Sequence, residues 1–138
     1  MSKLQGKWKL HDSENWDEYM KASGVGFVLR KVGNNITTYE EITQDGDTWE
    51  LHITSTFKSS HLKFQLGVEF DEVTMDGRNV KSLFRLEGDK LLHDQKGTKP
   101  GEVGSFITRE LVDDDTMAIT FVSSEKNVTA KRFFKRYT

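Results

Sequence analysis

The chain has 138 residues, of which 35% are hydrophobic and 30% are charged, and its formal net charge is −2. This length predicts one domain spanning residues 1–138. The absence of cysteine excludes a disulfide scaffold, a cysteine nucleophile and a thiolate metal site. The balanced charge argues against bulk attraction to nucleic acid. No apolar stretch is long enough for a membrane span or a secretory signal, so we expect a cytoplasmic protein.

Two short helices are expected near the N-terminus. The first carries Trp16, Tyr19 and Met20 on one face, at spacings of three and four, and is expected to stop at Gly24. The second is expected over residues 27–32, ended by the Gly-Asn pair that follows. With the short glycine-containing segment between them, these helices form a compact helical pair.

The rest of the chain alternates between apolar and polar residues with period two. Trp49, Leu51 and Ile53, for example, alternate with polar neighbours, and Asp-Gly turn signals separate such runs. An antiparallel meander of this length must curl or close to protect its edges. The pattern therefore predicts an all-β, up-and-down barrel, with the helical pair inserted between its first two strands.

Two arginines fall on the side of their strands that should face the interior. In the last strand, Lys131 and Lys135 mark the solvent face, which directs Arg132 inward. Arg109 shares a face with Ile107 and is also directed inward. Because arginine keeps its proton, it needs an anion or a wet cavity. Two such residues on neighbouring strands predict a site for a buried anion; the alternative is a register in which Arg132 faces solvent.

Further polar side chains are expected inside the barrel. His93 and Gln95 lie on the inner face of one strand, where they would line a solvated cavity. If Tyr39 and Glu41 face outward, then Glu40 faces inward, where it would pair with an arginine and compete with an anionic ligand. The alternative is a one-residue bulge that turns Glu40 to solvent.

Short motifs spread over nearly the whole chain are the most specific signal in the sequence. They occupy residues 6–10, 13–21, 24–27, 30–31, 55–58, 66–72, 76–82 and 93–96. Together they resemble the cytosolic fatty-acid-binding protein family, the intracellular lipid-binding branch of the calycin superfamily. The resemblance implies a ten-stranded β-clam lidded by two helices. It also implies a monomeric, non-enzymatic carrier that holds a long-chain fatty acid and needs no cofactor.

The resemblance also implies roles for individual residues. In this family one arginine, together with an Arg-x-Tyr motif on the last strand, binds the ligand carboxylate; Arg109 and Arg132 match these arginines. Phe134 stands where tyrosine is usual, which removes one hydroxyl donor, and Trp16 stands where phenylalanine is commoner. The cavity and portal positions implied are Trp16, Tyr19, Met20, Val25, Leu29, Glu40, Ile53, Ser55, Phe57, Met75, Asp76, Arg78, His93, Gln95, Ile107, Ile119, Phe121 and Phe134.

The helical pair carries Lys21, Arg30 and Lys31, and the resemblance makes these the surface for transient contact with anionic membranes. Two alternatives stay open: another anionic lipid, such as retinoic acid or a bile-acid-like ligand, and a signalling module that delivers lipid to membranes or nuclear receptors. No nucleophile–base set or cofactor loop is visible, which argues against an enzyme. The four histidines come from separate strands without compact spacing, so no metal site is expected.

Overall fold

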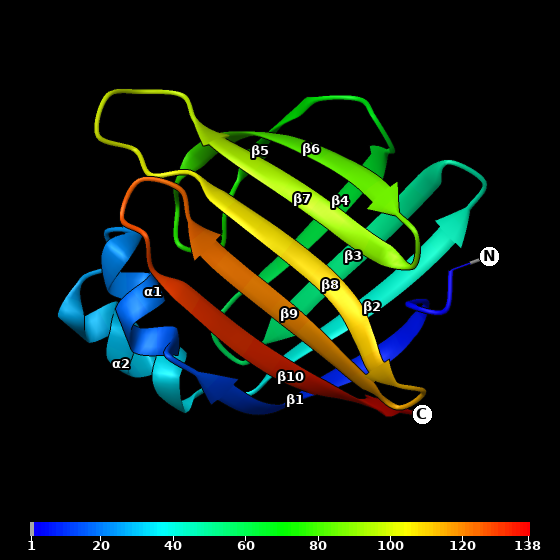
Figure 1. Ribbon diagram of the computed structural model, residues 1–138. Helices are drawn as coiled ribbons and strands as arrows, with labels where there is room; N and C mark the ends of the chain where they lie inside the picture. The colour runs from blue at the N-terminus through cyan, green and yellow to red at the C-terminus, as the bar shows by residue number, and fades with distance from the viewer. Residues whose placement is uncertain (1) are drawn as a thin grey trace.

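The computed structural model describes residues 2–138, which form one ten-stranded antiparallel sheet and two helices (Figure 1). Both helices lie between the first two strands, as the sequence predicts. The helices are α1 (Trp16–Ala22) and α2 (Phe27–Asn35). The strands are β1 (Gly6–Glu14), β2 (Thr38–Asp45), β3 (Thr48–Ser55), β4 (Ser59–Gln65), β5 (Phe70–Val73), β6 (Asn79–Glu87), β7 (Lys90–Gly97), β8 (Ser105–Asp113), β9 (Thr116–Ser123) and β10 (Thr129–Tyr137).

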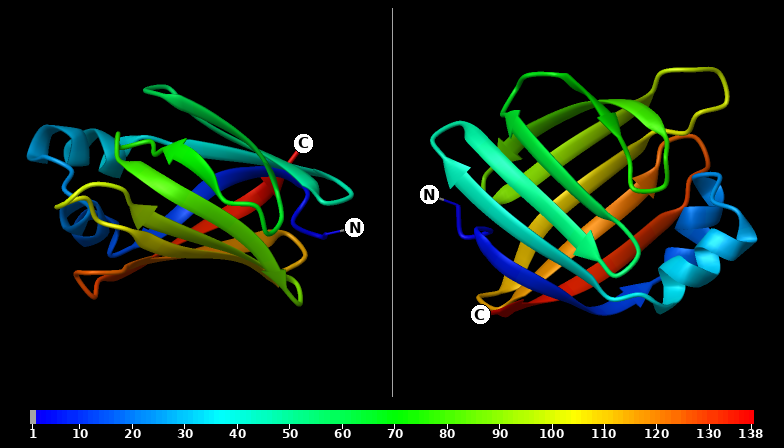
Figure 2. Two further views of the ribbon diagram at one scale, coloured as in Figure 1. Left: turned by 90° about the horizontal axis from the view of Figure 1, so that it is seen from above. Right: turned by 180° about the vertical axis from the view of Figure 1, so that it is seen from behind.

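The strand order is β4-β3-β2-β1-β10-β9-β8-β7-β6-β5, so sequence neighbours pair and β1 closes against β10. Figure 2 shows the strands in two facing layers, with the helices across one end. Across residues 2–138 no ladder joins β4 to β5, so the barrel stays open along this side. The predicted up-and-down barrel with a two-helix insertion is confirmed.

The inner face of the sheet carries a core of large apolar side chains. Trp8, Trp49, Phe84, Met117 and Phe134 are almost completely buried and belong to one cluster. Each fully buried side chain of this size contributes about 2–3 kcal/mol from removal of apolar surface from water. Most inward side chains are therefore apolar, and the few inward polar residues lie among them.

The helical lid differs from the sequence expectation in its length. Helix α2 continues through Gly33 to Asn35 instead of ending before Gly33. A Cβ atom at Gly33 would lie 2.7 Å from Sδ of Met20 on α1. The glycine therefore leaves room for the Met20 side chain and does not end α2. Within residues 2–138, no helix is both long and apolar enough to cross a membrane.

Candidate functional site

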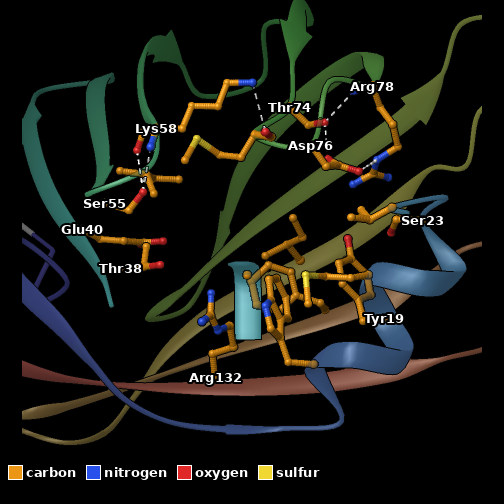
Figure 3. A pocket seen from close by; sticks show the side chains of 18 of the residues that line it. Tyr19, Ser23, Thr38, Glu40, Ser55, Lys58, Thr74, Asp76, Arg78 and Arg132 are labelled. Carbon is orange, nitrogen blue, oxygen red and sulfur yellow. Dashed lines mark hydrogen bonds and ion pairs between the residues drawn. The ribbon is translucent and has the colours of Figure 1, made fainter. Parts of the chain in front are cut away.

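An internal cavity of about 220 Å³ lies between the helical lid and the inner faces of the strands (Figure 3). Every position in the predicted cavity and portal set lines it except Ile119. Ile119 on β9 lies opposite both Arg109 and Arg132 in the sheet register and is fully buried in the apolar core. The two arginines are therefore separated by one strand and are not on neighbouring strands as expected. The long arginine side chains reach the cavity on either side of Ile119, whereas the shorter isoleucine stays in the wall.

The first polar feature of the cavity is an ion pair between β8 and β2. Arg109 donates from Nε to Oε1 of Glu40 and from Nη2 to Oε2, both at 3.1 Å. The two side chains are only 3% and 4% exposed. Thr38, Glu40 and Ile42 are all buried while their neighbours are not, so β2 runs without a bulge at Glu40. This two-bond geometry satisfies the carboxylate and offsets the charge of Arg109.

Arg132 on β10 has different surroundings. Its Nε donates to Oγ of Ser13 at 3.0 Å, and its guanidinium lies 4.1 Å from the ring centre of Trp16. Burial lowers the pKa of Arg132 to about 10, although the Glu40 carboxylate acts in the opposite direction. The side chain therefore stays charged at neutral pH. Across residues 2–138 no carboxylate forms an ion pair with Arg132, which lines the cavity.

A second polar cluster joins β5, β6 and β7. Oε1 of Glu72 accepts hydrogen bonds from Oγ of Ser82 at 2.5 Å and from Nε2 of Gln95 at 3.2 Å, and Nε2 of His93 lies 3.2 Å from it. The His93 ring stacks on Phe84 with centroids 3.8 Å apart. His93 and Gln95 were expected here, whereas Glu72 was not singled out. The apolar residues of its strand, Phe70 and Val73, lie three positions apart, so a period of two assigns no face to Glu72.

Burial and hydrogen bonding shift the titration of this cluster. Desolvation lowers the pKa of His93, although the Glu72 carboxylate acts in the opposite direction. Desolvation also acts to raise the pKa of Glu72, but contacts with His93, Ser82 and Gln95 outweigh it and lower that pKa. The cluster thus favours a neutral imidazole beside an ionised carboxylate.

One side of the cavity mouth is held by hydrogen bonds around Arg78. Its Nε donates to Oδ2 of Asp76 at 2.7 Å, and its Nη1 donates to the carbonyl oxygen of Val103 at 2.7 Å. The hydroxyl oxygens of Tyr19 and Ser105 lie 2.5 Å apart, which ties α1 to β8. Figure 3 shows Arg78 and Asp76 together at this rim. These contacts connect the lid with the β5–β6 and β7–β8 loops.

The open side of the barrel is bridged at the same end. Nζ of Lys58, in the β3–β4 turn, donates to the carbonyl oxygen of Met75, in the β5–β6 turn, at 3.2 Å. The neighbouring Phe57 is 57% exposed although it lines the cavity. A single surface hydrogen bond and an exposed aromatic ring make this the weakly held side of the mouth. The other polar lining residues outside the predicted set are Ser23, Thr38, Glu72 and Thr74.

The three lid cations are not equivalent. Lys21 and Lys31 are exposed. Arg30 is 18% exposed; its Nε pairs with Oδ1 of Asp17 at 3.3 Å and its Nη1 donates to the carbonyl oxygen of Val25 at 2.8 Å. Arg30 therefore stabilises the lid internally, and the solvent-facing positive charge of the predicted cluster comes from the two lysines.

A meander barrel lidded by two helices, with a few buried charges in a mainly apolar cavity, defines the class of small lipid-binding β-barrels. Residues 5–137 match the lipocalin / cytosolic fatty-acid binding protein family, and the chain belongs to this family. Solved members of the family are named as fatty-acid-transporting and fatty-acid-binding proteins, and the chain is a non-enzymatic binding protein of this family.

Three relatives span nearly the whole chain. The sodium/calcium exchanger regulatory protein 1 of Doryteuthis pealeii is 42% identical over 133 residues, which cover 96% of both chains. A solved fatty-acid-binding protein from brain tissue of Drosophila melanogaster is 48% identical, with a TM-score of 0.85 and coverage of 97% of this chain and 99% of that one. The Schistosoma mansoni fatty-acid-binding protein in complex with arachidonic acid is 42% identical, with a TM-score of 0.90 and coverage of 100% and 98%.

Proposed function

We propose that the protein carries a long-chain fatty acid in its internal cavity and that Arg132 binds the carboxylate. One observation carries this proposal: Arg132 is a buried, cavity-lining cation without a carboxylate partner in the described chain, while Arg109 is already paired with Glu40. A ligand carboxylate would offset the cost of burying the Arg132 charge. Arg109 would act at longer range.

The apolar wall supplies the affinity in this scheme. A chain of about 16 carbons gains roughly 12 kcal/mol from burial, at about 0.8 kcal/mol per methylene. Immobilisation of the ligand costs several kcal/mol of this gain. The headgroup contact then sets the orientation and chemical class of the ligand, while the hydrocarbon tail provides most of the binding free energy.

The relatives support the same ligand class. The Schistosoma protein is named with arachidonic acid, a long-chain fatty acid, and the Drosophila protein is named as a fatty-acid-binding protein. By analogy with the cytosolic family, we place the carrier in the cytoplasm as a monomer that exchanges its ligand with membranes. Retinoic acid and bile-acid-like lipids share the anionic headgroup but not the flexible chain.

Calorimetric titration of Arg132→Gln with a fatty acid and with the fatty alcohol of equal chain length tests the proposal. We expect the acid to lose affinity at least tenfold and the alcohol to change little. Lys131→Gln, on the exposed face of the same strand, is the matched control. Equal losses for acid and alcohol would contradict charge recognition by Arg132. Retinoic acid binding more tightly than the fatty acid would contradict the assignment of ligand class.

A further inference from the structure

Three metal-ligating side chains meet on the outer face of the β3–β4 hairpin. Glu50, His52 and His61 place one donor atom each within 4.8 Å of one another. His52 and His61 face each other directly in the antiparallel register, with ring centroids 3.8 Å apart. Nε2 of His61 also lies 3.0 Å from Oε1 of Glu50. The spacing of the histidines in the sequence gives no sign of this cluster, because it is the hairpin register that brings His52 and His61 together.

We propose that these side chains bind a divalent transition-metal ion with the coordination chemistry of Zn²⁺. Two imidazoles and one carboxylate form a donor set that suits Zn²⁺, with a fourth position left for water. Mg²⁺ and Ca²⁺ favour oxygen ligands, so they fit this set poorly. The donor set therefore distinguishes the site from a general cluster of surface acids.

The geometry needs only local adjustment to close around an ion. Tetrahedral zinc with bonds of about 2.0–2.1 Å holds its donors roughly 3.3 Å apart. The His61 and Glu50 side chains are 49% and 39% exposed, so solvent gives them room to rotate. The stacked rings must turn so that one nitrogen of each points at the ion. Directly opposed residues on antiparallel strands start close enough for such a turn.

The charged surroundings and the strand alternation separate this site from the lipid cavity. Glu41 faces His52 from β2, and Lys63 faces Glu50 from β4, so one further charge of each sign borders the donors. Leu51 and Ile53, which alternate with the donors along β3, line the cavity on the opposite face. An ion bound here does not contact the fatty-acid headgroup.

Binding would act on the open side of the barrel. The two histidines belong to different strands, so a shared ion would link β3 to β4 across their ladder. Strand β4 is the edge strand of the sheet, and the turn that joins it to β3 carries Phe57 and Lys58 at the cavity mouth. Because the ion binds only when the hairpin holds its donors together, it stabilises the folded chain.

Calorimetric titration of the full chain with Zn²⁺, in buffer free of chelators, tests the proposal. We expect one ion per chain and at least tenfold weaker binding in His52→Asn and in His61→Asn. His11→Asn, which removes an exposed histidine on β1, is the control and should bind like the unmodified protein. Mg²⁺ at the same concentration should give no binding heat.

A thermal unfolding series provides an independent readout. Zn²⁺ should raise the melting temperature of the unmodified chain and of His11→Asn, but not that of His61→Asn. The melts without metal show whether each variant is folded. Unchanged Zn²⁺ affinity in both His52→Asn and His61→Asn would overturn the proposal, as would the absence of saturable binding to the folded, unmodified chain.

Discussion

Glu40 on β2 and Arg109 on β8 form a buried pair with two parallel hydrogen bonds of 3.1 Å, so one of the two inward arginines already has an anion. Arg132 rests instead on Ser13 and the face of Trp16. Because Glu40 also acts electrostatically on Arg132, it offsets charge on both cations. A ligand carboxylate bound to Arg132, as we propose, would therefore compete with Glu40 for the same positive charge.

Glu40→Gln should destabilise the ligand-free protein and increase its affinity for fatty acid. Removal of one partner from a buried ion pair costs about 3–5 kcal/mol, so the free energy of unfolding without ligand should fall by an amount near the lower end of that range. The affinity for fatty acid should rise, because the internal competitor is gone. Denaturant unfolding and calorimetric titration of the same variant measure the two quantities.

Glu41→Gln is the control for this experiment, since its side chain lies on the other face of β2. We expect little change in either quantity for that variant. If Glu40→Gln left both the ligand-free stability and the affinity unchanged, the ion pair would have no energetic role in the cavity.

Strand alternation was enough to place most of the inward polar residues. A period of two directs Arg109, Arg132, His93 and Gln95 inward from their neighbours alone, because a one-residue slip would expose the whole apolar face. It predicted an arginine partner for an inward Glu40 but not that this partner is Arg109, and it did not predict the contact between Arg132 and Trp16. Those partners are distant in sequence, and closure of the sheet and docking of the lid bring them together.

The departures from prediction have the same origin in tertiary contacts. Gly33 looked like a helix stop, but its missing side chain serves the contact with Met20. Ile119 has the character of a cavity residue, yet its place between two long arginines keeps it in the wall. His52 and His61 become neighbours only through the hairpin register. In each case the sequence pattern around the residue gives no information about its contacts, because strand pairing or helix packing creates them.

Trp16→Leu should weaken binding of the fatty acid through loss of the surface on which Arg132 rests. A cation–π contact of this kind contributes about 0.5–2 kcal/mol, so a loss of roughly twofold to thirtyfold is expected. Trp16→Phe should retain most of the affinity, because a ring remains under the guanidinium. Calorimetry with the acid and the matching alcohol makes the comparison. An equal loss for the alcohol would show that Trp16 acts only as apolar wall.

The Glu72–His93 cluster predicts a loss of stability on acidification. The folded state holds the pKa of His93 below its ordinary value of 6.5. Just below pH 6.5, His93 therefore binds a proton in the unfolded chain but not in the folded chain. Stability contributed by His93 should therefore fall as the pH drops from about 6.5 towards the lowered pKa. The pKa of Glu72 is held below 4.5, which extends the loss to more acidic pH.

Denaturant unfolding between pH 7 and pH 5 measures the His93 part of this effect. His93→Gln keeps a hydrogen-bond donor beside Glu72 but removes the titrating ring, so its stability should depend less steeply on pH over this interval. His11→Gln, at an exposed position on β1, is the control and should keep the slope of the unmodified chain. Identical slopes for His93→Gln and the unmodified protein would contradict the assignment.

Lys21 and Lys31 should speed transfer of ligand to anionic membranes, whereas Arg30 should not act in this way. Each exposed cation near an anionic surface contributes about 1 kcal/mol, and both lysines face solvent while Arg30 is engaged with Asp17 and Val25. Lys21→Glu with Lys31→Glu should slow transfer to vesicles containing phosphatidylserine and leave the affinity in solution unchanged. Arg30→Glu should instead lower the thermal stability, because it breaks the internal contacts of the lid.

Stopped-flow transfer of a fluorescent fatty acid, at low and high salt and with neutral vesicles for comparison, separates these effects. A transfer rate that is independent of vesicle charge and of salt would mean that the ligand leaves by diffusion through water, with no contact between the lid and the membrane.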